Sequence, residues 1–307
     1  MLIIRNFSFI FPICCILFLS CASLSPVSGR AERLASSASP EAVIPRWQPL
    51  PVPNSTDDNV FLAYYAGRVL RPRIEFNALR VDLTNPELRI LAAGSGHSGD
   101  PVDGKFLSAK VSTFVRNNNL VAGINALPFD PVSGKEGETR TNIGIVITGG
   151  EVISPPYAKF DALAFYAGGA AAIIAQSAIP SDTLHAVGGF HRILEGNELV
   201  PRVLNAEARH PRSAAGISPD GRYLYLLAID GRRPGSIGST EAETALVLKA
   251  LGAGEGINFD GGGSSALVLR YPNGKIRAAN TPIHDLIPGR ERAVAGCLGI
   301  GITAAPP

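Results

Sequence analysis

The sequence lacks the features that mark several classes of protein. Its 28 lysine and arginine residues nearly balance its 26 aspartate and glutamate residues, and a net charge of +2 over 307 residues gives no nucleic-acid footprint. There is no long run of one charge, no heptad pattern and no internal repeat. We therefore expect neither a nucleic-acid partner nor a coiled coil nor a repeat architecture.

Cysteine is scarce and is badly placed for disulfides. Cys14 and Cys15 fall in an apolar N-terminal segment, Cys21 follows that segment, and Cys297 stands alone in an apolar run near the C-terminus. Because no internal disulfide framework can be drawn, the folded part must be stabilised by its hydrophobic core.

Motifs for metals and nucleotides are missing as well. The five histidines lack the spacing of metal ligands, and the acidic residues of the glycine-rich loops match no Ca²⁺-binding loop. There is also no P-loop pattern for a nucleotide. We therefore predict neither a metal site nor a cofactor. The residues considered are His97, His185, His191, His210 and His284 among the histidines, and Asp100, Asp103, Asp130 and Glu136 among the acids.

The first 21 residues have the composition of an export signal. Arg5 supplies a small positive region, and an apolar run over residues 7–19 is too short for a comfortable membrane span but has the size of a signal-peptide core. Small residues and Cys21 then resemble the lipobox of bacterial lipoproteins, although leucine is absent three places before Cys21. We predict an exported protein, either a cell-envelope lipoprotein acylated at Cys21 or a secreted or periplasmic protein.

A flexible tether and one domain are expected after the signal. Residues 22–56 are rich in Ser, Pro and Ala and show no sustained periodicity, which is typical of a flexible linker. Residues 57–307 have a globular composition that no second linker interrupts. About 250 residues suit a single large domain.

Short apolar runs separated by Gly, Pro, Asn and Asp predict β-strands throughout this domain. Residues 148–151 (Thr-Gly-Gly-Glu) and 273–274 (Asn-Gly) predict hairpin turns, and residues 218–221 (Ser-Pro-Asp-Gly) predict a further turn. The expected strands are residues 60–70, 74–83, 87–93, 121–126, 143–148, 162–167, 171–176, 213–218, 223–230, 256–260, 266–270 and 293–303.

Two stretches have the apolar periodicity of a helix, residues 106–117 and residues 240–251. In the second, Thr240 is the expected N-cap, Glu243 completes a capping box and Gly252 ends the helix. Because strands dominate, the expected fold class is α+β, with a mostly antiparallel β-sheet core and a few packed helices.

The second helix connects two expected strands, residues 223–230 and 256–260. If these strands run parallel, joined by a right-handed crossover, Asp230 and Asp260 end neighbouring strands at the same edge of the sheet. We hypothesise that the two carboxylates converge there.

Residues 257–265, Ile-Asn-Phe-Asp-Gly-Gly-Gly-Ser-Ser, combine a strand end, a carboxylate, a bare backbone and two hydroxyl groups. Three successive glycines lose much backbone entropy on folding, so a fold keeps them only where positive φ or close backbone approach is needed. Bare N–H groups beside hydroxyl groups suit the oxygens of a phosphate or a sugar. The alternative is a glycine-rich hairpin in which Asp260 is a turn residue.

Six segments of the chain occur in an order shared with a known family. They are Val-Ala-Gly-Ile-Asn-Ala (121–126), Val-Gly-Gly to Leu-Val (187–200), His-Pro-Arg-Ser-Ala-Ala-Gly-Ile (210–217), the strand that ends in Asp-Gly-Arg (223–235), Asn-Phe-Asp-Gly-Gly-Gly-Ser-Ser (258–265) and Arg-Glu-Arg-Ala-Val-Ala with the last strand (290–300). Through them residues 105–303 resemble the phosphodiester glycosidase domain family, most strongly from residue 186 onward.

Two segments depart from that family's pattern. The family's Asn-Gly-Gly is Asn125-Ala126-Leu127 here, so the close approach that the two glycines allow is partly lost. The family's Glu-Arg-Pro carries Ala293 in place of proline, which softens a turn. The first departure puts the shape of the substrate pocket in question.

The resemblance implies a sugar 1-phosphodiester as substrate and, from its chemistry, two catalytic residues. Glycosidases commonly divide acid–base work between two carboxylates, here Asp260 first and Asp230 second. Because phosphate departs with less need of a proton, a carboxylate that faces the anomeric carbon matters more than a general acid. For Asp230 a turn residue before glycine is the alternative.

Further residues are expected to bind the substrate. A guanidinium group meets two phosphate oxygens at once, which suits Arg212 and Arg292, although a surface ion pair is the alternative for each. Asn125 is expected to bond a sugar hydroxyl or else to cap the following loop. A nucleophilic serine is the weaker option because no histidine is arranged beside it. The residues expected to bind phosphate or sugar oxygens are Gly261, Gly262, Gly263, Ser264 and Ser265.

We therefore expect an exported hydrolase, a phosphodiester glycosidase, that acts without a cofactor on a sugar 1-phosphodiester of a surface or extracellular glycan. One alternative is a non-catalytic glycan- or phosphoglycan-binding envelope lipoprotein, which the departure at Ala126 and Leu127 favours. Another is a structural envelope protein. The expected partners are a carbohydrate phosphodiester and, only through a lipid on Cys21, a membrane; the sequence leaves the oligomeric state open.

Overall fold

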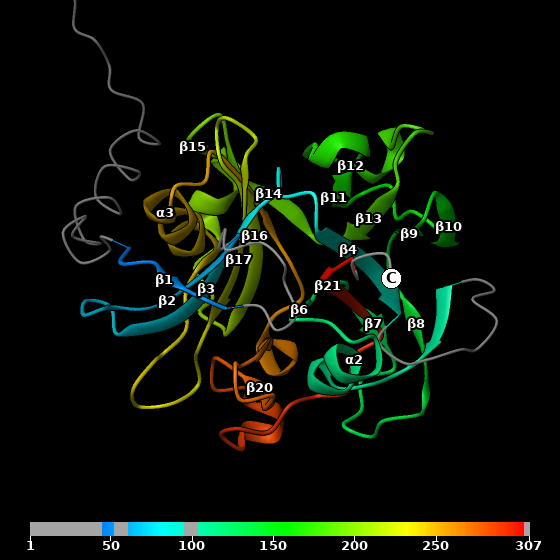
Figure 1. Cartoon of the computed structure of the whole chain (residues 1–307). Helices are drawn as coiled ribbons and strands as arrows, with labels where there is room; N and C mark the ends of the chain where they lie inside the picture. The colour runs from blue at the N-terminus through cyan, green and yellow to red at the C-terminus, as the bar shows by residue number, and fades with distance from the viewer. Residues whose placement is uncertain (1–44, 52–60, 95–103, 304–307) are drawn as a thin grey trace, which may run out of the picture.

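The computed structural model describes residues 45–51, 61–94 and 104–303 (Figure 1). The predicted signal at residues 1–21, with Cys21, lies outside the described residues, as does most of the predicted tether. In the described part of the chain, no helix combines the length and the apolar character needed to cross a bilayer.

Residues 45–51 of the predicted tether belong to the domain. β1 (Gln48–Pro49) pairs antiparallel with β2 (Leu62–Val69). The ring of Trp47 lies 5.9 Å from that of Tyr225, and Leu50 is buried. Because these two large apolar side chains dock on the sheet, the domain begins before residue 57.

An eight-stranded antiparallel sheet dominates the domain, in the order β1-β2-β3-β17-β16-β18-β14-β15. β16 pairs antiparallel with β17 on one side and with β18 on the other, so β17 and β18 run in the same direction. Beyond β1 and β2, its strands are β3 (Ile74–Asp82), β14 (His191–Glu195), β15 (Glu198–Leu199), β16 (Arg212–Ile217), β17 (Tyr223–Ile229) and β18 (Glu255–Asn258).

Three smaller antiparallel sheets accompany it in the described residues. The first has the order β20-β19-β6-β21-β4, the second β10-β9-β13-β11-β12, and the third β5-β8-β7. Their strands are β4 (Leu88–Gly94), β5 (Lys105–Leu107), β6 (Ala122–Asn125), β7 (Phe129–Asp130), β8 (Thr139–Asn142), β9 (Val146–Thr148), β10 (Glu151–Ser154), β11 (Asp161–Phe165), β12 (Ala171–Ala175), β13 (His185–Gly188), β19 (Leu267–Arg270), β20 (Ile276–Ala278) and β21 (Gly296–Ile302).

The main core lies where one face of the eight-stranded sheet meets the two five-stranded sheets. Leu226 and Ile257 of the large sheet cluster with Ile124, Leu298 and Leu163 of the smaller sheets, and each of these side chains is fully buried. Each contributes about 1.5–3 kcal/mol of hydrophobic stabilisation. The core therefore fixes the ends of β6, β16 and β18 relative to one another.

Helix α3 (Glu241–Leu251) covers the other face of the eight-stranded sheet. The predicted capping box is confirmed, since the Thr240 hydroxyl accepts from the Glu243 N–H at 3.1 Å and the Glu243 carboxylate accepts from the Thr240 N–H at 3.0 Å. Gly252 ends the helix at φ 111°. Leu248 comes close to the sheet because Gly256 beneath it has no Cβ, which would lie 3.0 Å from the leucine side chain.

Helix α2 (Val111–Asn117) packs on β6 and β19 and is shorter than the sequence predicts. Residues 105–107 form β5, where Phe106 pairs with Arg140, so the apolar face attributed to one helix is divided between a strand and a helix. Five short 3₁₀ turns follow, η3 (Ala167–Gly169), η4 (Gln176–Ala178), η5 (Pro201–Asn205), η6 (Gly262–Ser264) and η7 (His284–Leu286).

The α+β class with mostly antiparallel sheet is confirmed. The turns at residues 148–151, 218–221 and 273–274 also connect antiparallel strands as predicted. The hypothesis of neighbouring parallel strands is wrong in one respect: β17 and β18 run in the same direction, but β16 lies between them.

Candidate active site

The triple-glycine bend lies where β16 begins and β18 ends. The Gly262 N–H donates to the Pro211 carbonyl at 2.8 Å, and the Asp260 N–H donates to the Ala126 carbonyl at 2.7 Å. The bend is therefore fixed against β16 on one side and against the end of β6 on the other.

The Asn125 side chain connects three segments around the bend. Its Oδ1 accepts from the Ser213 hydroxyl at 2.7 Å and from the Ala266 N–H at 3.1 Å, while its Nδ2 donates to the Asp260 carbonyl at 2.7 Å. With its side chain 1% exposed, Asn125 positions the backbone around Asp260. The Asn125 side chain is therefore bonded within the protein, whereas the sequence suggested a bond to a sugar hydroxyl.

The glycines are required by the close approach of other groups. A Cβ on Gly261 would lie 2.7 Å from the Pro211 carbonyl oxygen, and a Cβ on Gly263 would lie 2.6 Å from an Nη atom of Arg292. Gly262 has φ 63°, and its Cβ would lie 3.0 Å from an Nη atom of Arg232. A bare backbone therefore lets two guanidinium groups press against the bend.

The N–H groups of the bend are mostly engaged within the protein. Besides Gly262, the N–H of Ser264 donates to the Gly261 carbonyl at 3.2 Å and that of Ser265 donates to the Gly262 carbonyl at 3.4 Å. The N–H groups of Gly262, Ser264 and Ser265 therefore have acceptors within the protein, and the substrate contacts expected of Gly261 and Gly263 stay predictions. The donors that face outward belong to the arginines.

A hollow of about 240 Å³ opens above the bend, and we call it the arginine hollow. No Asp or Glu is among its lining residues, so three guanidinium groups share it without an acidic partner on its wall. Such an excess of positive charge and N–H donors is typical of a site for a phosphate or a carboxylate. The lining residues are His210, Arg212, Arg232, Gly261, Gly262, Gly263 and Arg292.

Two of these arginines are held by the protein. Arg212 donates through Nε to the Ser239 carbonyl at 3.2 Å and through Nη2 to the Ala208 carbonyl at 3.0 Å. Arg292 donates through Nε to His284 Nδ1 and through Nη1 to the Ser264 hydroxyl, each at 3.2 Å. Burial lowers the pKa of both guanidinium groups, and the charge of Asp260 opposes that effect at Arg292.

Asp260 is half-buried next to the arginine hollow. Burial raises the pKa of its carboxyl group to about 6, against the Ser264 hydroxyl, the Arg292 charge and the Gly261 N–H, which stabilise the charged form. A carboxyl group that titrates close to neutral pH suits acid–base or nucleophilic work. Ser264 joins the two charged groups because its hydroxyl contacts both.

Asp230 is bonded by groups of the protein. Its Oδ1 accepts from the Thr281 N–H at 2.8 Å and from Asn280 Nδ2 at 3.2 Å, and its Oδ2 accepts from Arg233 Nη2 at 2.7 Å. It lines a second hollow of about 390 Å³, the Asp230 hollow, together with Arg68, Glu75 and Arg233, and this hollow shares no lining residue with the arginine hollow. β16 separates the strands that Asp230 and Asp260 follow, but Asn280 Nδ2 donates both to Asp230 and, at 3.1 Å, to the Ser265 carbonyl of the bend. The convergence of the two carboxylates stays a prediction.

Ser265 adds a buried hydroxyl group to the same bend. It is 1% exposed, and its Oγ has no hydrogen-bond partner. The two serines that the sequence placed together therefore differ, since Ser264 contacts Arg292 and Asp260 while Ser265 faces the protein interior.

Sequence reasoning did not select Arg232 or His284. Arg232 follows Asp230-Gly231 and adopts φ 58°, which aims it at the glycine bend. The Asp-Gly-Arg segment was a signal for it, because that segment was already part of the family resemblance. His284 gave no signal, since its contact with Arg292 depends on a loop that no local pattern predicts.

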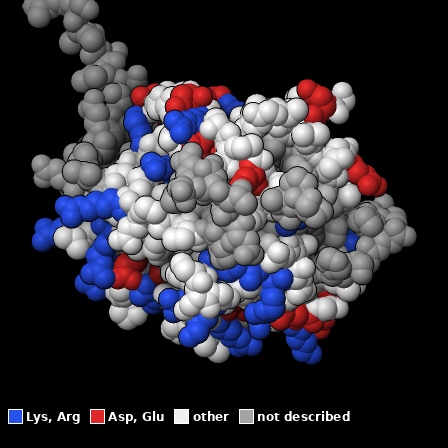
Figure 2. All heavy atoms as spheres, in the orientation of Figure 1, with Lys and Arg blue, Asp and Glu red and all other residues white. Residues whose placement is uncertain are grey.

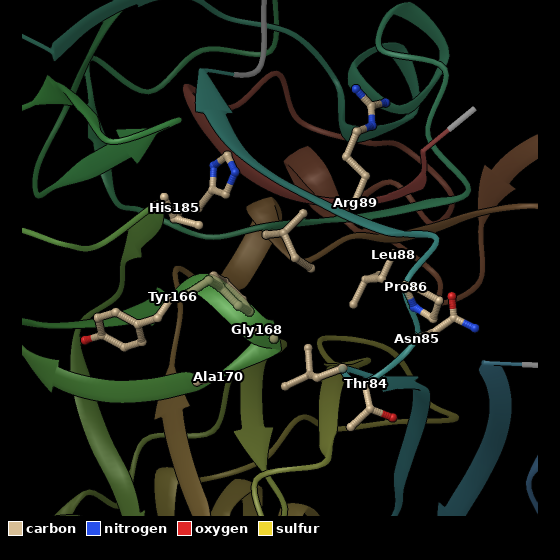
Figure 3. Close-up of a pocket in the computed structure, with 14 residues that line it drawn as sticks. Thr84, Asn85, Pro86, Leu88, Arg89, Tyr166, Gly168, Ala170 and His185 are labelled. Carbon is tan, nitrogen blue, oxygen red and sulfur yellow. The ribbon is translucent and has the colours of Figure 1, made fainter. Parts of the chain in front are cut away.

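A third hollow, of about 440 Å³, lies between the β3–β4 connection and the turn that joins β11 to β12 (Figure 3). Its walls are mainly apolar, and it has no residue in common with the arginine hollow. Figure 3 shows the Tyr166 ring pointing away from the facing loop of Asn85 and Leu88, and Arg89 donates to the Asn118 carbonyl at 2.7 Å. It therefore offers no cluster of free polar groups for chemistry.

Basic side chains gather along the lower and left margins of the face shown in Figure 2, and Figure 1 places β20 at the lower margin and β2 at the left margin. Among the described residues, no group of three or more His, Cys, Asp or Glu side chains is arranged to hold a metal ion. Cys297 is free and buried, and burial raises the pKa of its thiol well above the usual value.

A family comparison matches the part of the chain that forms the candidate site. The sequence profile of the phosphodiester glycosidase family (NAGPA) matches residues 118–301. No protein with a curated description matches the chain in sequence.

Solved structures share the fold. A hypothetical protein from Synechocystis has a TM-score of 0.59 and 14% identity, and the match covers 79% of this chain and 62% of that protein. The zebrafish N-acetylglucosamine-1-phosphodiester alpha-N-acetylglucosaminidase catalytic domain, auto-inhibited by its pro-peptide, has a TM-score of 0.60 and 18% identity over 84% of this chain and 88% of that one. A Burkholderia pseudomallei K96243 protein described as a candidate exported protein has a TM-score of 0.54 and 17% identity over 75% of this chain and 74% of that one. At such identities these likenesses show the fold alone.

Proposed function

The chain belongs to the phosphodiester glycosidase family, and on this premise we propose that it hydrolyses sugar 1-phosphodiesters, cleaving the bond between the anomeric carbon and the phosphate oxygen. The observation that supports this most is the arginine hollow. No acidic residue lines it beside the three guanidinium groups, and the charge of Asp260 acts on Arg292.

The phosphodiester lies in the arginine hollow in this proposal. Its single negative charge is matched by Arg212, Arg232 and Arg292, and their N–H groups bond its oxygens as the leaving phosphate gains charge. Because Arg212 and Arg292 are already oriented by protein acceptors, little reorganisation is needed when the substrate binds.

Asp260 acts on the sugar side. As a carboxylate it stabilises the positive charge that grows at the anomeric carbon, and it either attacks that carbon or takes a proton from the attacking water. The phosphate departs as a phosphomonoester without needing a strong general acid. The Ser264 hydroxyl and Arg292 hold the carboxylate in place and favour its charged form.

The departure from the family at Ala126 and Leu127 does not reach the hollow. Both side chains are buried, with 0% and 1% exposed, and a Cβ on Gly296 would lie 2.6 Å from Leu127. Leu127 thus fills the core. This favours a working enzyme over the alternative of a glycan-binding protein without activity.

Export is part of the proposal. It is supported by the signal-like composition of residues 1–21 and by the description of the Burkholderia relative. The substrate class is therefore a phosphodiester-linked sugar of a surface or extracellular glycan, with lipid attachment at Cys21 as one form of the mature protein.

The test uses a chromogenic sugar 1-phosphodiester and the purified protein. Wild type is expected to release the sugar and a phosphomonoester, while Asp260→Asn releases neither but still binds the substrate. Binding without turnover by wild type would instead establish the glycan-binding alternative, and absence of both would remove the hydrolase proposal.

A further inference from the structure

Two buried oxygen atoms on the α3 side of the site have no hydrogen-bond partner. They are Oε2 of Glu241, the first residue of α3, and Oδ1 of Asn258, the last residue of β18. Asn258 is only 1% exposed. A buried polar atom without a partner costs about 1–3 kcal/mol, so two of them in one region point to a missing donor.

The strand register places Asn258 beside the arginine hollow. Asn258 is paired with His191 on β14 and with Ala214 on β16, so these three side chains share one face of the sheet. Arg212 comes two residues before Ala214 on β16 and lies on that face as well, next to the end of β18.

Glu241 lies beside Arg212. Its Oε1 lies 3.8 Å from Arg212 Nη1, with 14% of the glutamate side chain exposed. Burial lowers the pKa of His191, and the charges of Arg202 and Glu241 act on this imidazole in opposite directions. Glu241 therefore lies beside Arg212, and its charge acts on His191.

Arg212 does not satisfy Glu241. A separation of 3.8 Å is too long for a hydrogen bond. Two other donor atoms of Arg212, Nε and Nη2, are bonded to the Ser239 and Ala208 carbonyls. Glu241 and Asn258 thus each have an acceptor oxygen without a donor. The neighbouring arginine hollow has three guanidinium groups and no carboxylate among its lining residues.

A sugar 1-phosphate has the complementary chemistry, with acceptor oxygens on its phosphate and donor hydroxyl groups on its ring. We propose that Glu241, Asn258 and His191 form the binding site for an uncharged sugar ring, whose hydroxyl groups donate to the two free oxygens while its phosphate lies in the arginine hollow. This site rests on the proposed function.

Half-buried aromatic rings border the same group. The Phe160 ring stands edge-on to His191 at 5.4 Å and to Phe190 at 5.1 Å between ring centroids. Phe190 is also tied to β18, since its N–H donates to the Asn258 carbonyl at 2.8 Å. These rings supply an apolar border of the kind that sugar and cofactor sites commonly have.

The experiment measures the binding of inorganic phosphate and of glucose 1-phosphate to the full chain by isothermal titration calorimetry. Wild type is expected to bind glucose 1-phosphate at least about 10-fold more tightly than inorganic phosphate. Glu241→Gln should remove about 10-fold of that preference, because a hydrogen bond to a charged group is lost, and should leave the phosphate affinity within about twofold. Glu75→Gln, an arginine-paired glutamate of the Asp230 hollow, is the matched control and should change neither affinity.

Asn258→Leu supplies an independent variant, because it removes the free oxygen while keeping a similar shape. It should also lower the preference for glucose 1-phosphate while its circular dichroism spectrum stays native. Equal weakening of both ligands, or an unchanged preference in both variants, would overturn the sugar site.

The two proposals fail in different ways. If wild type binds inorganic phosphate but does not prefer glucose 1-phosphate, the sugar site is overturned and the arginine hollow stands. If wild type binds neither ligand, the proposed function fails, and the sugar site with it.

Discussion

The arginine hollow and the Asp230 hollow lie at the same end of the strands of the eight-stranded sheet. They differ in how their charged side chains are paired. In the Asp230 hollow, Arg233 contacts both Glu75 and Asp230. Burial lowers the pKa of Arg233, but the two carboxylates outweigh burial and raise it above the usual value. In the arginine hollow, burial prevails and lowers the pKa of Arg212 and of Arg292.

The difference separates structure from function. A buried charge that has its partner within the fold stabilises the native state or costs it little, whereas an unpaired one is costly and is kept for a ligand. In the Asp230 hollow, two carboxylates and two guanidinium groups balance one another, namely those of Asp230, Glu75, Arg68 and Arg233. The three arginines above the glycine bend outnumber their two carboxylate neighbours, Asp260 and Glu241, which is why we place the substrate there.

The largest effect that this comparison predicts is the loss of catalysis in Asp260→Asn. Removal of the acid–base or nucleophilic carboxylate should lower kcat by about 10³-fold or more. The measurement is steady-state hydrolysis of a chromogenic sugar 1-phosphodiester. Asp230→Asn is the matched carboxylate change in the other hollow, and a loss of kcat as large there would return Asp230 to the active site.

The second prediction compares the kinetic effects of removing one guanidinium group from each hollow, by Arg292→Gln and by Arg233→Gln. Arg292→Gln should reduce kcat/KM by about 10²-fold, because the departing phosphate loses a charged donor. Arg233→Gln should leave kcat/KM within about threefold and lower stability instead. Equal kinetic losses in the two variants would break the distinction between a ligand site and a structural ion cluster.

Asp230→Asn is expected to cost stability. Asp230 has 3% of its side chain exposed and accepts from Arg233, Asn280 and Thr281, so weakening these bonds should lower the free energy of unfolding by about 2 kcal/mol. Urea denaturation followed by tryptophan fluorescence measures the change. Unchanged stability would show that the cluster is not structural.

Two glycine-to-alanine substitutions, one in each hollow, form a matched pair with smaller expected effects. A Cβ on Gly263 would lie 2.6 Å from an Nη atom of Arg292, and a Cβ on Gly235 would lie 2.7 Å from an Nη atom of Arg233. Gly263→Ala should displace Arg292 and lower kcat/KM by about 10-fold, whereas Gly235→Ala should displace Arg233 without a kinetic effect. A kinetic loss in Gly235→Ala alone would reverse the assignment of the two hollows.

The smallest expected effect is the pH dependence that Asp260 imparts. Its pKa is raised from 3.8 to about 6, so the charged form is disfavoured in the native state. Its contribution to stability is therefore fully present below pH 3.8 and is lost as pH rises through about 6. Over the same range kcat/KM should rise, since the carboxylate is the active form.

The stability of Asp260→Asn relative to wild type should accordingly increase between pH 4 and pH 7, as urea titrations at several pH values would show. A kcat/KM that falls with pH in this range would mean that Asp260 acts in its protonated form.

Local patterns in the sequence predicted much of the fold. Thr240, Glu243 and Gly252 bound α3 because capping depends on residues a few positions apart. The strands at residues 139–142 and 276–278 were not predicted, because they are short and partly polar and are stabilised by pairing with distant strands. The helix expected over residues 106–117 begins only at Val111 for the same reason, since β5 pairs with β8.

The candidate site was predictable in composition but less so in geometry. Arg212, Arg292 and the three glycines come together as the family resemblance implied. The position of Asp230 could not be predicted, because it depends on β16 lying between two strands that the helix connects. The sequence suggested ligand contacts for Asn125, yet a buried amide surrounded by three strands finds its partners in the protein.

The crowding of three guanidinium groups over the glycine bend has a consequence for handling the protein. Their mutual repulsion is relieved by whichever small anion the buffer supplies, so phosphate or sulfate should raise the melting temperature, whereas an equal concentration of chloride should do so less. The apparent thermal stability of this protein is then partly a property of its counterions. A comparison of variants is meaningful only at a fixed anion composition.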